Sequence, residues 1–137
     1  MERTTAPAPL PRGTRVLTIG LHPRALDYSR MPEGLDEAAM AARIEAGHAL
    51  VREAGFDAVS CLIDGDPDGA ERAVRAHLRD REFGLAMIGG GVRMLPEHTL
   101  LFERIVDVLG EAEPRIRLCF NTSPEGVVDA LKRWVSG

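Results

Sequence analysis

Two short segments of the chain combine side chains that can move protons with side chains that can bind anions. The first, residues 22–34, reads HPRALDYSRMPEG and holds His22, Arg24, Tyr28 and Arg30. Histidine titrates near neutral pH, so His22 is a candidate acid–base group and Tyr28 a candidate assistant. Guanidinium groups suit carboxylates and phosphates, so Arg24 and Arg30 are candidate ligand-binding residues.

The second segment, residues 87–99, reads MIGGGVRMLPEHT. Its three consecutive glycines are Gly89, Gly90 and Gly91. Glycine permits a positive φ and a close approach of the backbone to a ligand, so we expect these residues to form one wall of a site. Arg93 is a candidate anion-binding residue in the same segment, and His98 is a third candidate catalytic group.

Two further polar connections follow apolar runs. Asp64 opens DGDPDG, and Asn121 and Thr122 open NTSPEG, where amide and hydroxyl groups can contact a ligand. The aspartates at 64, 66 and 68 lack the complete pattern of a calcium loop, so we expect no metal site.

Each candidate also has a purely structural interpretation. His22 can order its loop, Tyr28 can anchor that loop to the body of the protein, and His98 can cap a helix. A single arginine is commonly a solvated surface residue. Convergence of two arginines on one pocket would favour the functional interpretation.

These segments belong to a regular alternation of apolar runs and helical spacing. The apolar runs are 15–21, 58–64, 83–90 and 115–121, and the helical segments are 35–55, 68–81, 97–112 and 124–135. Nearly continuous apolar runs are typical of parallel strands covered on both faces. Four strand–helix units predict a doubly wound α/β domain with strand order 2-1-3-4, which is flavodoxin-like or Rossmann-like.

That topology predicts where a site lies. Ligands of open α/β sheets bind beyond the carboxyl ends of the strands, where the strand order reverses. Here the reversal falls between the first and third strands, so residues 22–34 and 87–99 face each other. We expect one domain over residues 15–137, preceded by a mobile, proline-rich tail over residues 1–14.

Composition excludes several classes of partner. The chain has 137 residues and a formal net charge of -4, which argues against nucleic-acid binding. No apolar stretch is long enough to cross a membrane, and the first residues lack the apolar centre of a signal peptide. Cys61 and Cys119 lie in apolar runs, as expected for buried thiols in a reducing cytoplasm.

Familiar cofactor motifs do not occur. The single lysine, Lys132, lies in the last helical segment, so there is no P-loop. GLHPRA follows the first strand where a dinucleotide-binding protein has Gly-x-Gly-x-x-Gly. A receiver domain would need an aspartate after the third strand, where Ile88 and Gly89 stand. We therefore expect no bound cofactor.

Two functions fit this pattern. The first is a cytoplasmic enzyme that acts on an anionic small molecule by acid–base chemistry, as an isomerase, lyase or cyclase. The alternative is a non-catalytic module that binds a nucleotide, a phosphate metabolite or a protein partner. A homodimer is also possible through the edge strands and Trp134, unless Trp134 packs back onto the sheet.

Overall fold

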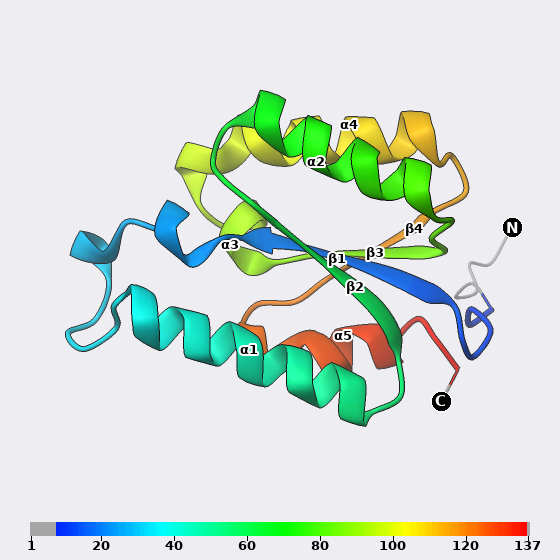
Figure 1. Ribbon diagram of the computed structural model, residues 1–137, viewed down its shortest axis with the longest axis horizontal. Helices are drawn as coiled ribbons and strands as arrows, with labels where there is room; N and C mark the ends of the chain where they lie inside the picture. Colours follow the sequence, from blue (N-terminus) through cyan, green and yellow to red (C-terminus); the bar gives the residue numbers. More distant parts are fainter. Residues whose placement is uncertain (1–7, 137) are drawn as a thin grey trace, which may run out of the picture.

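Four parallel strands form one sheet in the computed structural model, which describes residues 8–136 (Figure 1). The strands are β1 (Arg15–Leu21), β2 (Asp57–Ile63), β3 (Leu85–Ile88) and β4 (Arg117–Phe120). Their order is β2-β1-β3-β4, which confirms the predicted order and the flavodoxin-like α/β fold.

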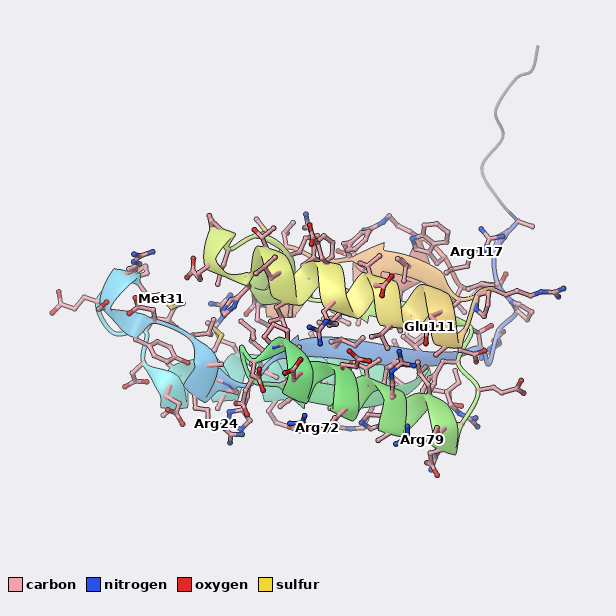
Figure 2. All side chains as sticks on the ribbon, turned by 90° about the horizontal axis from the view of Figure 1, so that it is seen from above. Arg24, Met31, Arg72, Arg79, Glu111 and Arg117 are labelled. Atoms are coloured by element: carbon pink, nitrogen blue, oxygen red, sulfur yellow. The ribbon has the colours of Figure 1, made fainter. Side chains whose placement is uncertain are left out.

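Helices cover both faces of the sheet (Figure 1). One face carries α1 (Glu37–Glu53) and α5 (Val127–Lys132), and the other carries α2 (Pro67–Asp80) and α4 (Thr99–Ala112). Figure 2 shows α2 and α4 side by side over the sheet. Aspartates begin two of these helices: a carboxylate oxygen of Asp36 accepts from the Ala39 amide at 2.8 Å, and Asp66 accepts from the Gly69 amide at 3.1 Å.

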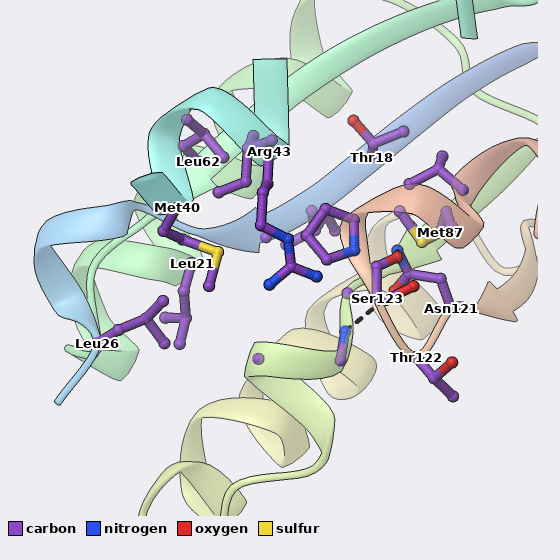
Figure 3. A pocket seen from close by; sticks show the side chains of 18 of the residues that line it. Thr18, Leu21, Leu26, Met40, Arg43, Leu62, Met87, Asn121, Thr122 and Ser123 are labelled. Atoms are coloured by element: carbon purple, nitrogen blue, oxygen red, sulfur yellow. Dashed lines mark hydrogen bonds between the residues drawn. The ribbon is translucent and has the colours of Figure 1, made fainter. Parts of the chain in front are cut away.

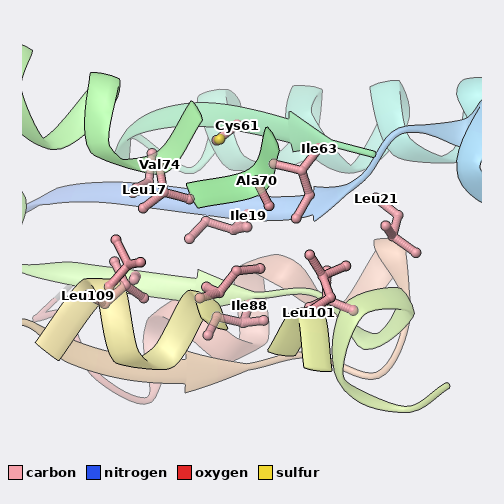
Figure 4. Packing of buried hydrophobic residues seen from close by; sticks show 14 of the residues in the cluster. Leu17, Ile19, Leu21, Cys61, Ile63, Ala70, Val74, Ile88, Leu101 and Leu109 are labelled. Atoms are coloured by element: carbon pink, nitrogen blue, oxygen red, sulfur yellow. The ribbon is translucent and has the colours of Figure 1, made fainter. Parts of the chain in front are cut away.

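Two hydrophobic cores lie on the two faces. The core under α2 and α4 packs Leu17 and Ile19 of β1 against Val74 and Ile105, and all four are fully buried (Figure 4). The core under α1 and α5 is smaller, with Val16 and Leu131 among its fully buried members. Alternate residues of β1 point to opposite faces, so one strand contributes to both cores.

The edge strand β2 is less buried than its apolar run predicted, since such a run is typical of a strand covered on both faces. Its residues Asp57, Ser60 and Leu62 are exposed, whereas all four residues of β3 are buried. β2 pairs only with β1 and therefore lacks a neighbour on one side. An apolar run therefore does not predict burial by itself, because burial depends both on composition and on the position of the strand in the sheet.

The connections are more ordered than the sequence suggested. The first one contains the 3₁₀ turns η1 (Pro23–Ala25) and η2 (Tyr28–Arg30). The glycine segment after β3 forms a helical turn, α3 (Gly90–Arg93), followed by η3 (Pro96–His98). Before α5 the chain forms η4 (Pro124–Gly126). The last helix is therefore shorter than the predicted 124–135.

The two ends of the described chain meet beside the sheet. The Leu10 amide donates to the Trp134 carbonyl at 2.7 Å, and the Ser136 amide donates to the Leu10 carbonyl at 2.9 Å. Trp134 packs against the core under α1 and α5, as the second interpretation of this residue predicted. The tail over residues 1–14 stays a prediction: residues 1–7 lie outside the described part, and the Leu10 contacts were not foreseen.

Within the described residues, no helix is both long enough and apolar enough to span a membrane.

Candidate functional site

A pocket of about 300 Å³ lies between α1 and the sheet, towards the carboxyl ends of the strands (Figure 3). Its floor is formed by Thr18 and Gly20 of β1, Ser60 and Leu62 of β2, and Met87 of β3. The facing wall consists of α1 residues, chiefly Met40, Arg43, Ile44 and His48. The segments that follow β3 and β4 close one end with residues 89–91 and 121–124.

The pocket exists because β1 places small residues on this face. Val16, Thr18 and Gly20 alternate along β1 towards α1, and Gly20 has no side chain to fill the space there. A Cβ at Gly20 would find one neighbour within 4 Å, Leu62 Cδ2 at 3.8 Å. The open space therefore begins where a larger residue would normally complete the core.

Methionine is as frequent as leucine in the apolar lining, with four residues of each type. The chain has five methionines. Four of them line this pocket: Met31, Met40, Met87 and Met94. They come from the long loop, α1, β3 and the end of α3, so the folded chain gathers them from separate regions. Thioether side chains are flexible and polarisable, and they let a pocket adapt to the shape of a ligand.

Asn121 connects the two segments, residues 89–91 and 121–124, that form the end wall of the pocket. Its Oδ1 accepts from the Gly90 amide at 3.0 Å, and its Nδ2 donates to the Ser123 carbonyl at 2.7 Å (Figure 3). Asn121 is 7% exposed, so both amide atoms are used inside the protein. A Cβ at Gly90 would lie 3.3 Å from the Thr122 carbonyl oxygen, so the close approach favours glycine here. None of Gly89–Gly91 has a positive φ.

An ion pair joins α1 to η4 beside the pocket. Arg43 Nε and Nη2 each donate to a carboxylate oxygen of Glu125 at 2.8 Å. This contact lowers the pKa of Glu125 from 4.5 to about 2. One turn further along α1, a Cβ at Gly47 would lie 2.5 Å from the Pro124 carbonyl oxygen. Helix α1 therefore packs directly against the η4 backbone.

Three polar side chains occupy the part of the pocket nearest the middle of the sheet: Thr18, Ser60 and His48. Thr18 and Ser60 are partners in the pairing of β1 with β2. Ser60 Oγ lies 3.5 Å from His48 Nε2, and Thr18 Oγ1 donates to the Val59 carbonyl at 3.4 Å. Both distances exceed those of good hydrogen bonds.

Five of the predicted site residues line this pocket: Gly89, Gly90, Gly91, Asn121 and Thr122. The structure brings them together from the two segments that follow β3 and β4. Thr122 is exposed, and its side chain points away from the other labelled residues in Figure 3. The other predicted residues do not line the pocket.

His22, Arg24 and Asp64 form a separate cluster at the ends of β1 and β2. His22 Nδ1 accepts from the Arg24 amide at 3.2 Å. Arg24 contacts Asp64 through Nε at 3.0 Å and Nη2 at 3.2 Å, which lowers the pKa of that carboxyl. This arrangement orders the loop after β1, the structural alternative considered for His22.

Tyr28 and Arg30 stabilise the long loop. The Tyr28 hydroxyl donates to the Pro23 carbonyl, and partial burial raises the pKa of the phenol. Arg30 Nε lies 3.6 Å from the Asp27 carboxylate, and its side chain is 75% exposed. Neither residue converges with Arg24 or Arg93 on the pocket. As catalytic or binding residues they stay predictions.

Arg93 lies behind the end wall, whereas His98 lies beside the segment that follows β2. Arg93 Nη2 donates to the Asn121 carbonyl at 3.2 Å, and the guanidinium carbon lies 5.3 Å from the centre of the Phe120 ring. Arg93 Nε is buried, with no hydrogen-bond partner among the described residues. His98 packs against Gly65, where a Cβ would lie 2.9 Å from the ring. Arg93 thus supports the wall that Asn121 forms.

The two cysteines are buried and unpaired with each other. Burial raises the pKa of the Cys61 thiol to about 11 and that of Cys119 to about 12. The thiolate is the reactive form of cysteine, so neither residue is a ready nucleophile at neutral pH.

Sequence reasoning missed most of the pocket lining. Thr18 and Ser60 carried a usable signal, because each is a hydroxyl residue within an apolar strand, in RVLTIGL and AVSCLID. His48 carries no separate signal, because it lies at helical spacing with Met40 and Ile44, which is typical of a core-facing position. The methionines carry no sequence signal, because only the fold brings them together.

Comparison with known protein families finds no match for this chain, and comparison with individually curated proteins finds none either.

Proposed function

We propose that this protein binds a small, largely apolar molecule in the pocket between α1 and the sheet. The observation that carries the proposal is a pocket over Gly20 whose lining is mainly apolar, with four methionines and four leucines among its residues. An apolar cavity with a few polar groups is the usual form of a small-molecule site. Its position at the carboxyl edge of a parallel sheet also agrees with where such folds bind ligands.

The polar groups of the lining favour an uncharged ligand over a phosphate-bearing one. Among residues 8–136, Arg43 is the only arginine or lysine that lines the pocket, and its charge is balanced by Glu125. The Gly90 amide, which could contact a phosphate, already donates to Asn121. An anion would have to compete with Glu125 for Arg43, or with the Asn121 side chain for the Gly90 amide. The anionic ligand inferred from the sequence rested on Arg24, Arg30 and Arg93, which lie outside the pocket.

The methionines themselves provide the test. We expect toluene and other small apolar compounds to shift the ¹³C-methyl NMR signals of Met31, Met40, Met87 and Met94, with inorganic phosphate leaving them unchanged. Gly20→Val should fill the space and weaken binding at least tenfold, because its Cβ has room there and valine suits a strand.

Gly110→Ala is the matched control. A Cβ at Gly110 would meet nothing within 4 Å, and α4 lies on the other face of the sheet, so binding should be unchanged. The proposal is wrong if no apolar compound moves the four signals, or if Gly20→Val binds as the unaltered protein does.

Acid–base chemistry on the bound molecule is a second candidate function, and the position of His48 favours it. His48 lines the pocket beside Ser60, whereas His22 and His98 do not. Histidine can transfer a proton at neutral pH. For a carbonyl compound that binds, deuterium incorporation from heavy water that is lost in His48→Gln would support an enzyme. Exchange no faster than without protein would leave binding as the function.

A further inference from the structure

Apart from Thr122 and Ser123 at the end wall, the polar side chains of the pocket fall into two groups that differ in how well the protein satisfies them. Asn121 uses both amide atoms in contacts of 3.0 and 2.7 Å, and Arg43 makes two contacts of 2.8 Å with Glu125. The remaining group is Thr18, Ser60 and His48, whose contacts are 3.4 and 3.5 Å long. Asn121 and Arg43 therefore hold the pocket walls together, while the second group retains hydrogen-bonding capacity.

Thr18 is the least expected member of that group. It is 6% exposed, and Val16 and Met87 beside it on this face belong to the hydrophobic core. A buried hydroxyl without a good hydrogen bond destabilises a fold, and valine would fill the same volume. A ligand group placed at Thr18 could form a shorter hydrogen bond than the 3.4 Å contact with the Val59 carbonyl.

The group also has a definite place in the pocket. His48 lies eight residues after Met40, which is about 12 Å along α1. Helix α1 runs against the direction of the strands (Figure 1). His48 contacts Ser60 in the middle of β2, and Met40, which is nearer the start of α1, therefore lies closer to the carboxyl ends of the strands. We call Thr18, Ser60 and His48 the inner end of the pocket, and Met31, Met40 and Met94 the outer end.

We propose that the inner end binds a hydroxyl or carbonyl group of the ligand while the outer end binds its apolar body. This inference rests on the proposed binding function and adds the chemical class, an uncharged alcohol or carbonyl compound. Thr18 and Ser60 can each donate or accept a hydrogen bond, and neutral His48 can do either, depending on its tautomer. Arg43, which lines the pocket, is already paired with Glu125, so among the described residues no unpaired arginine or lysine lines the site to attract a carboxylate.

Three matched probes separate the possibilities: toluene, benzyl alcohol and benzoate. Their affinities are measured from the methionine methyl signals, and Met87 reports on the inner end because it pairs with Thr18 across β1 and β3. In the unaltered protein we expect benzyl alcohol to bind more tightly than benzoate. Thr18→Val should weaken benzyl alcohol relative to toluene by roughly fivefold, the value of one hydrogen bond.

Ser60→Ala is a second variant, on an exposed edge position where folding is not at risk. It should also weaken benzyl alcohol relative to toluene, and the affinity for toluene should not fall in either variant. An unchanged ratio of the two affinities in both variants would overturn the inference while leaving the binding function in place. Tighter binding of benzoate than of benzyl alcohol would overturn the uncharged class. If none of the three probes moves the methionine signals, the proposed function fails as well.

Discussion

Two glycines shape the pocket in opposite ways. Gly20 leaves open space on the sheet, because its Cβ would have a single neighbour at 3.8 Å. Gly47 allows α1 to approach η4 so closely that a Cβ would lie 2.5 Å from the Pro124 carbonyl oxygen. One glycine therefore creates the volume, and the other fixes the wall that encloses it.

Gly47→Ala should destabilise the protein by about 2 kcal/mol, because the added methyl group forces α1 away from a backbone atom that cannot rotate aside. In an unobstructed helix the same substitution stabilises by up to about 1 kcal/mol. Gly110→Ala provides that comparison within α4. Urea unfolding of both variants measures the difference, and a stabilising effect at Gly47 would contradict the packing described here.

At the scale of elements, α1 is attached to η4 by packing at Gly47 and by the Arg43–Glu125 ion pair. Glu125 has a pKa of about 2 against an ordinary value of 4.5. A lowered pKa in the folded state means that the carboxylate stabilises the fold above the unfolded pKa. This contribution is lost as the pH falls towards the folded pKa.

The free energy lost in Glu125→Gln should therefore depend on pH. The difference between the unaltered protein and the variant should be largest near neutral pH and should vanish between about pH 5 and about pH 2. The side chains of Arg43 and Glu125 are 38% and 54% exposed, so we expect less than about 1 kcal/mol, decreasing with added salt. Urea unfolding across this pH range measures it, with the exposed Glu97→Gln as control. A difference that does not change with pH would show that the ion pair contributes nothing.

The fold was largely predictable because its elements repeat. The pattern of apolar runs and helical spacing yields four strand–helix units, and parallel topology then limits the strand order to few choices. The turn at Gly90–Arg93 was not predictable, because consecutive glycines favour no single conformation. The exposure of β2 was not predicted, because the sequence of one strand does not show which strands lie beside it in the sheet.

The pocket lies at the edge of the sheet where a site was predicted, but most of its lining was not predicted. Gly89–Gly91, Asn121 and Thr122 line the pocket because topology brings the ends of β3 and β4 together. The charged candidates at His22, Arg24 and Asp64 satisfy one another instead, and charge alone does not distinguish those two outcomes. Methionine and threonine attract little notice in a sequence, yet Thr18 and four methionines line this cavity.

At the scale of the whole molecule, the helices on the two faces of the sheet differ in how many apolar side chains they bury. Helix α4 buries Leu101, Ile105, Val108 and Leu109 within 14 residues. Helix α1 buries Met40, Gly47 and Val51 within 17 residues, since the pocket lies beneath part of it. Less apolar surface therefore holds α1 in place.

Local opening should follow this difference. We expect backbone amides near Met40 in α1 to exchange with heavy water at least about tenfold faster than those near Ile105 in α4, because opening α1 exposes less apolar surface. Hydrogen exchange followed by NMR measures both sets. A bound ligand should slow exchange in α1 and leave α4 unchanged. Equal protection of the two helices without ligand would show that the pocket does not weaken this face.

The contact between Leu10 and Ser136 also determines how the protein can be handled. The two residues are hydrogen-bonded to each other at the end of the sheet opposite the pocket (Figure 1). A tether placed at either residue would hold the molecule on a sensor surface with the pocket facing the solution. A short linker could also join these two positions, so that new termini could be opened in a surface loop elsewhere in a circularly permuted chain.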